Sequence, residues 1–263
     1  MADIRKVTRR EYKVMLDHRL FLDRKPAAEA FCRDLHSCAK RLPRIECDGK
    51  FESTSKREIV FLDTPDQTIA LNKLVFRQRT DLENGGTEYT LKCRSPDRYI
   101  AAAADVENAK GRKGKSKFEE DIGAPFVVRF SRSNTVAGAK TPPTTLRLAA
   151  GIFPLLGRLK RDERPCPPDL ELKPANALTF YERVLEGPKL RFDRTEAQVA
   201  LILWSDGAEG RPILGEFSFR YGNKQEEYDA NMARLAMEFF SECQRMDWCL
   251  PGARTKTQFV YDG

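Results

Sequence analysis

The sequence predicts an α+β fold: a closed antiparallel β-barrel of about eight strands with flanking helices, in a single domain over residues 1–263. Three observations lead to this prediction. Several segments alternate charged and apolar residues with a period of two, two segments carry the apolar stripe of a surface helix, and the charges of the alternating segments are sorted by sign. If helices cover the apolar face of the sheet, its charged face must enclose a polar interior.

The first strand and the first helix are predicted near the N-terminus. In "RREYKVML", Arg9, Glu11 and Lys13 fall on one face of a strand and the apolar residues fall on the other. Residues 26–42 then place apolar side chains at i, i+4 and i+7, after a proline whose missing N–H is tolerated in a first helical turn. This segment is predicted to be a helix that covers the sheet.

Two consecutive strands with basic faces follow. The turn "LDTPD" precedes "LVFRQR", where Arg77 and Arg79 share one face because they are two residues apart. In "TEYTLKCRS", Lys92 and Arg94 share a face in the same way. Neighbouring cations on one face indicate a shared anion.

The second half of the chain alternates loops with further strands. Residues 101–116 and 161–176 are predicted to be linkers or mobile loops because they are rich in small, basic or proline residues, and a short helix is predicted within 142–161. Strands are predicted at "KFEEDI", which carries Glu119 and Asp121, and at "GEFSFRY". Residues 228–248 form a second predicted amphipathic helix.

The composition limits the class of protein. The chain has a net charge of +7 and a pI near 9.0, which implies an anionic partner, either nucleic acid, a membrane surface or a phosphorylated molecule. Its seven cysteines include no C-x-x-C pair and only two histidines accompany them, so a zinc site is not expected. No apolar run has the length of a signal peptide or membrane span, and we therefore expect a cytoplasmic protein that does not enter membranes.

The order of the segments resembles that of the CYTH domains, also called triphosphate tunnel metalloenzymes. The family pattern is an E-x-E-x-K strand, a "YFDTPD…L…L.LR.R" segment, a "TLK" strand, an acidic E-x-E strand, a basic strand, a second E-x-E strand and a lysine near the C-terminus. This chain has "REYKVML", "FLDTPDQTIALNKLVFRQR", "EYTLKCR", "KFEEDI", "LRFDRTEAQVAL", "GEFSFRY" and "RTKTQFVY" in that order. The resemblance spans nearly the whole chain, and its middle motif is fairly specific.

The resemblance implies a metal-dependent triphosphatase. The family includes inorganic and thiamine triphosphatases, class IV adenylate cyclases and some RNA triphosphatases, so the partner would be a triphosphate or polyphosphate anion and the cofactor Mg²⁺ or Mn²⁺. The anion-binding residues implied are Lys13, Arg77, Arg79, Lys92, Arg194 and Lys256, and less strongly Arg94, Arg57, Lys189 and Arg191. The implied metal ligands are Glu11, Glu119, Asp121 and Glu216, and the implied catalytic residues are Glu11 and Lys13.

The chain departs from the family pattern at two acidic positions, which hold Arg9 and Ser218. The remaining acids could still hold one metal ion for hydrolysis. Alternatively, the protein binds a triphosphate or polyphosphate without efficient turnover. A third, less favoured hypothesis treats the basic segment "KGRKGKS" as a nucleic-acid contact, and a solvated sheet face remains the alternative to a charged lumen. The sequence does not identify the triphosphate or the oligomeric state. It also leaves open whether Arg9 faces the lumen or lies at a frayed strand end outside it.

Overall fold

The computed structural model describes residues 6–250 and 252–261. The strands are β1 (Arg9–Leu16), β2 (Ile45–Asp48), β3 (Glu52–Asp63), β4 (Leu74–Asp81), β5 (Thr87–Ser95), β6 (Gly114–Gly123), β7 (Val127–Gly138), β8 (Lys160–Arg161), β9 (Arg164–Pro165), β10 (Lys173–Glu186), β11 (Lys189–Phe192), β12 (Thr195–Ser205) and β13 (Pro212–Gly222). The helices are α1 (Arg24–Lys40), α2 (Thr68–Leu71), α3 (Arg98–Ala103), α4 (Leu146–Ala150), α5 (Ala230–Cys243) and α6 (Lys256–Tyr261), with 3₁₀ turns η1 (His18–Phe21) and η2 (Pro154–Arg158).

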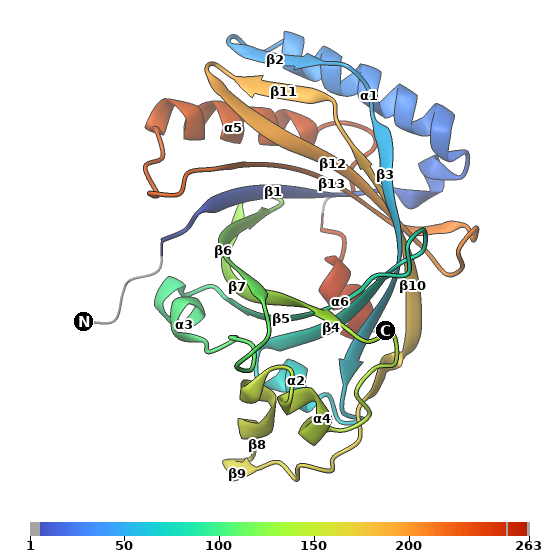
Figure 1. The fold of residues 1–263 in the computed structure, drawn as a ribbon. Coiled ribbons are helices and arrows are strands. Elements are labelled where there is room, and N and C mark those ends of the chain that lie inside the picture. The colour runs from blue at the N-terminus through green and yellow to red at the C-terminus, as the bar shows by residue number, and fades with distance from the viewer. Residues whose placement is uncertain (1–5, 251, 262–263) are drawn as a thin grey trace.

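The predicted α+β barrel is confirmed, with a different strand count and one parallel pair. Within the described ranges, nine strands close in the order β10, β3, β4, β5, β7, β6, β1, β13, β12, and β12 pairs back to β10 (Figure 1). The pairing of β1 with β6 is parallel, so the barrel is mixed rather than wholly antiparallel. Alternation predicts which face a side chain occupies, but it carries no information on the direction of the neighbouring strand.

Helices cover the outside of the barrel where the apolar faces lie. α1 and α5 pack on the outer faces of β1, β12 and β13, in a cluster that includes Tyr12, Phe31, Phe217 and Phe239 (Figure 1). Both helices lie within two to five residues of their predicted ends. α5 begins where the Asp229 side chain accepts a hydrogen bond from the Met232 N–H, a common N-terminal cap. This covering turns the charged faces of these strands inward.

One part of the barrel interior is apolar. In the register between β3 and β4, Ile59 and Phe61 lie opposite Arg79 and Arg77, so all four side chains point to the interior. The two apolar residues pack with Val260 of α6 and with interior residues of β10, β12 and β13. The short C-terminal helix therefore packs inside the barrel. The sequence predicted a wholly polar interior, and this part of the prediction was wrong.

The segments predicted as loops contain regular structure. Residues 101–116 include the end of α3 and the start of β6, and residues 161–176 include β9 and the start of β10. The short helix predicted within 142–161 is present as α4, followed by η2, and both pack on the outer faces of β3, β4 and β5. Among the described residues, no helix combines the length and the apolar character that crossing a bilayer requires.

Candidate functional site

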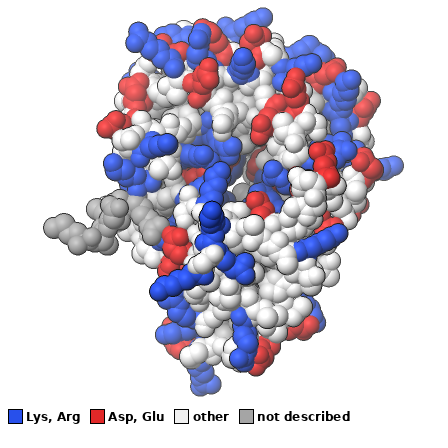
Figure 2. Space-filling view, in the orientation of Figure 1, with Lys and Arg blue, Asp and Glu red and all other residues white. Residues whose placement is uncertain are grey.

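One wall of the barrel carries an excess of interior cations, and the other carries interior carboxylates together with cations that pair with them. Strands β3, β4 and β5 are neighbours and turn cations to the interior, whereas β6, β1 and β13 are neighbours and carry most of the interior carboxylates. The interior cations of the first wall are Arg57, Arg77, Arg79, Lys92 and Arg94. The carboxylates of the second wall are Glu11, Glu119, Asp121 and Glu216. Figure 2 shows Lys, Arg, Asp and Glu side chains around a hollow near the centre of one face.

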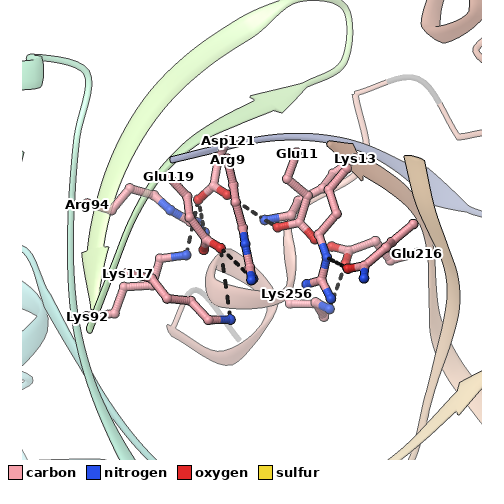
Figure 3. Close-up of polar contacts among 12 residues, drawn as sticks. Arg9, Glu11, Lys13, Lys92, Arg94, Lys117, Glu119, Asp121, Glu216 and Lys256 are labelled. Atoms are coloured by element: carbon pink, nitrogen blue, oxygen red, sulfur yellow. Dashed lines mark hydrogen bonds and ion pairs between the residues drawn. The ribbon is translucent and has the colours of Figure 1, made fainter. Parts of the chain in front are cut away.

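Asp121 lies where the two walls meet through their side chains. Its Oδ2 atom is 3.1 Å from Lys92 Nζ and 3.1 Å from an Arg94 guanidinium nitrogen, and its Oδ1 atom is 2.7 Å from Lys13 Nζ (Figure 3). Burial alone would raise the pKa of Asp121, but the three cations outweigh it and hold that pKa well below its ordinary value. Asp121 is therefore ionised, and both of its carboxylate oxygens contact cations.

Lys13 joins Asp121 to Glu11. Its Nζ atom is 2.8 Å from Glu11 Oε2 and 2.7 Å from Asp121 Oδ1 (Figure 3). Burial acts to lower the pKa of Lys13, but the two carboxylates outweigh it and raise that pKa above its ordinary value. The side chain is a permanent ammonium between two carboxylates.

The other two predicted acids also have basic partners. Glu119 Oε1 is 3.6 Å from an Arg9 guanidinium nitrogen and 3.9 Å from Lys117 Nζ (Figure 3). Arg9 therefore belongs to β1 and points at an interior carboxylate, rather than lying at a frayed end outside the lumen. Glu216 is 2.7 Å from Lys256 Nζ, which reaches it from α6.

Arg77 is the least compensated cation of the basic wall. No hydrogen bond or ion pair of its guanidinium is found among the described residues, and its Nε atom is buried without a partner. Burial, followed by the neighbouring Arg79, lowers the pKa of Arg77 to about 9. Since the charged form of Arg77 is destabilised in the free protein, an anion that reached it would relieve this cost.

Glu182 is an interior carboxylate that sequence reasoning missed. It is buried on β10, its Oε2 atom accepts a 3.0 Å hydrogen bond from Trp204 Nε1, and its Oε1 atom lies 3.7 Å from Arg57 and 3.6 Å from Arg79. Burial would raise the pKa of Glu182, but Arg79, Lys256 and the Trp204 hydrogen bond outweigh it and lower it to about 2. The alternation of "TFYERVL" could have indicated a strand, but its neighbours are not sorted by charge.

Three predicted anion-binding residues lie outside the lumen. Arg194 is exposed in the two-residue turn between β11 and β12, and Lys189 and Arg191 are exposed on β11. The Asp193–Arg194 pair forms a hairpin turn, with Asp193 at a φ of 52°, so the segment taken as one basic strand is two strands. The residues of β12 opposite the interior positions of β13 are the uncharged Gln198, Ala200 and Ile202.

The carboxylates as arranged do not fit a divalent metal ion. Each of the four predicted ligands is within 3.9 Å of a Lys or Arg nitrogen. In the part of the chain that the structure describes, no group of three His, Cys, Asp or Glu side chains is placed to hold a metal. Mg²⁺ or Mn²⁺ would have to displace these cations from their carboxylates.

Comparison with known proteins gives likenesses in fold only. No protein-family model matches the chain, and no curated protein matches it in sequence. Among solved structures, a candidate adenylate cyclase from Bacillus halodurans has a TM-score of 0.45 at 13% identity, over 97% of this chain and 98% of that one. A candidate adenylyl cyclase from Hippeastrum, described as having a dominant triphosphatase activity, has a TM-score of 0.45 at 12% identity, over 96% of this chain and 95% of that one.

A third solved structure is similar over nearly the whole chain. It is to a candidate adenylate cyclase from Vibrio parahaemolyticus, with a TM-score of 0.37 at 14% identity, over 97% of this chain and 99% of that one. Identities this low do not carry an activity from those proteins to this chain. The function has to be inferred from the charged lumen itself.

Proposed function

We propose that the charged lumen binds an anion with several linked phosphoryl groups, either a triphosphate-bearing molecule or inorganic polyphosphate. The observation that carries this proposal is the excess of cations on β3, β4 and β5, with Arg77 left without a partner among the described residues. Guanidinium groups bind phosphate oxygens through paired, charge-assisted hydrogen bonds. A linear polyanion supplies several such oxygens along one wall.

Lys92 and Arg94 extend this wall beyond Arg77. Burial lowers the pKa of Lys92 to about 8 even though Asp121 acts in the opposite direction. The carboxyl group of Asp121 is shared among three cations, so none of them is fully neutralised by it. An entering polyanion would therefore gain contacts with Lys92 and Arg94 without first breaking a dedicated ion pair.

Direct binding of tripolyphosphate tests the proposal. Isothermal titration calorimetry should detect binding by the wild-type protein, and replacing both Arg77 and Arg79 by alanine should abolish most of it while the fold is retained. The two arginines face the interior and contribute no side chain to the outer apolar clusters. An unchanged affinity in the double variant would contradict the proposed site.

Exposed basic residues supply the control against a nucleic-acid function. Lys113 immediately precedes β6, Lys115 is its second residue, and both are exposed. Their replacement by alanine should leave tripolyphosphate affinity unchanged. A protein that instead bound RNA through them, with a steep dependence on salt, would favour the nucleic-acid hypothesis.

Hydrolysis of the bound anion with Mg²⁺ or Mn²⁺ is the second candidate function. Four carboxylates lie on the neighbouring strands β6, β1 and β13, but each contacts a Lys or Arg in the free protein, so this candidate requires that those cations be displaced. The substitution Arg9→Glu would add an acid beside Glu119, remove one of the two cations that neutralise it, and should raise metal affinity. Phosphate release from tripolyphosphate, measured with each metal for the wild type and for Arg9→Glu, separates binding alone from turnover.

A further inference from the structure

The Lys13 side chain occupies the position between β1 and β6 where a cation could bridge two carboxylates. Lys13 Nζ lies 2.8 Å from a Glu11 oxygen and 2.7 Å from an Asp121 oxygen (Figure 3). A divalent ion shared by two carboxylates would occupy the same position. Because Lys13 is on β1 itself, two residues from Glu11, its ammonium is held there by the chain.

The surroundings of Lys13 favour the ammonium over a metal ion. The other Asp121 oxygen is contacted by Lys92 and Arg94, each at 3.1 Å, and a divalent ion would experience repulsion from both. Ser218 lies opposite Lys13 in the register with β13, and it offers a hydroxyl group where a third carboxylate could complete a metal site. Two carboxylates and several cations are a poor ligand set for a hard divalent ion.

We propose that Lys13 is a built-in cation that replaces a divalent metal ion between Glu11 and Asp121, so that the lumen binds its anion without metal. The second half of this statement rests on the proposed anion-binding function, whereas the first half concerns the chain alone. The ammonium offsets part of the charge of the two carboxylates, with Lys92 and Arg94 also contacting Asp121, and so reduces their repulsion of the entering phosphoryl groups. The unpaired charge of the basic wall, at Arg77 above all among the described residues, is then available to the anion.

Metal binding by Lys13→Met in the absence of any phosphate tests the first half. Methionine keeps the length and apolar stem of lysine and removes the charge. Mn²⁺ affinity at pH 7 should rise at least about tenfold over the wild type, because the repulsion of one unit charge at contact distance is removed. Mn²⁺ should also raise the thermal midpoint of Lys13→Met, since it bridges carboxylates that now repel each other, and should leave the wild-type midpoint unchanged.

Lys117→Met is the matched control. It removes the same charge from the lumen, but among the described residues the ion pair of Lys117 is with Glu119 alone, at 3.9 Å, and does not bridge two carboxylates. An equal rise in Mn²⁺ affinity in both variants would mean a general charge effect and would overturn the proposal. Wild-type protein that binds Mn²⁺ as tightly as Lys13→Met would overturn it as well.

A measurement on the wild type alone covers the case in which Lys13→Met does not fold. Tripolyphosphate affinity in excess EDTA should equal that in saturating Mn²⁺ within about twofold, after correction for the metal bound by tripolyphosphate itself. Binding that requires Mn²⁺ would overturn the proposal. If tripolyphosphate binds in neither condition, the proposed anion-binding function fails, and the Mn²⁺ titrations still decide the role of Lys13.

Discussion

At the scale of single residues, Arg77 distinguishes a binding site from a structural ion-pair network. A half-buried cation whose Nε atom is buried without a partner costs stability in the free protein and gains contacts in the complex. We expect Arg77→Gln to weaken tripolyphosphate binding by about 10- to 100-fold, the loss of one charge-assisted contact of about 1.5–3 kcal/mol. The same variant should not lower the free energy of unfolding, as measured by urea denaturation.

Arg194→Gln is the matched control for Arg77→Gln. It removes the same charge from an exposed turn outside the lumen, so the affinity should stay within about twofold of the wild type. Equal losses in the two variants would mean that the net charge of the protein, rather than the interior wall, attracts the anion.

The titration of Lys92 should make the stability of the protein and its affinity for the anion depend on pH in opposite directions. Its pKa is lowered from an ordinary 10.5 to about 8, so between these values the unfolded chain binds the extra proton and the folded protein does not. The contribution of Lys92 to the free energy of unfolding should therefore rise as the pH goes from 8 to 10.5. Anion binding needs the protonated form, so affinity should fall over the same range.

The comparison with Lys92→Met isolates this effect from the titration of the ligand and of other side chains. The difference in tripolyphosphate affinity between the two proteins should be largest below pH 8 and should shrink above it. A difference that stays constant from pH 7 to pH 10 would contradict the shifted pKa.

At the scale of elements, sequence alternation predicted the faces of the strands well and their ends less well. Where the predicted interior face is mainly charged and the other face mainly apolar, as in β1, β4, β5 and β6, the predicted interior side chains do face the interior. The prediction failed for Arg194 because a two-residue hairpin turn interrupts the segment, and it missed Glu182 because the neighbouring residues of β10 are not sorted by charge. When charged and apolar residues alternate on both sides of a short turn, the pattern reads as one continuous strand and the turn is not detected.

The helix α6 provides a test at the same scale. Val260 is fully buried against the apolar part of the interior, where Phe61, Phe180 and Trp204 pack. We expect Val260→Ala to lower the free energy of unfolding by about 2 kcal/mol, from lost burial and the cavity left behind. Met237→Ala on the exposed side of α5 should cost much less in the same urea denaturation experiment, and equal losses would contradict the inward packing of α6.

At the scale of the whole molecule, closure of the barrel follows from burial. Helices cover the apolar faces, the charged faces are left to face one another, and closing the sheet pairs the edge strands β10 and β12. The sequence predicted this closure because strands with charged faces on one side and apolar faces on the other must enclose a polar interior when helices cover the apolar faces. It could not predict the parallel pairing of β1 with β6 or the apolar packing of α6, since both depend on contacts between residues far apart in the chain.

The size of the basic wall predicts how affinity should depend on the ligand. Its cations are spread over three neighbouring strands, which are about 4.8 Å apart, so one phosphate cannot reach all of them. Affinity should rise at least about tenfold from phosphate to pyrophosphate and again to tripolyphosphate, because each added phosphoryl group gains about one charge-assisted contact. Calorimetric titrations at constant ionic strength and pH 7, with EDTA present, measure this series. A protein that bound phosphate as tightly as tripolyphosphate would have a site for a single anion, and the linear arrangement of cations across β3, β4 and β5 would then have no part in recognition.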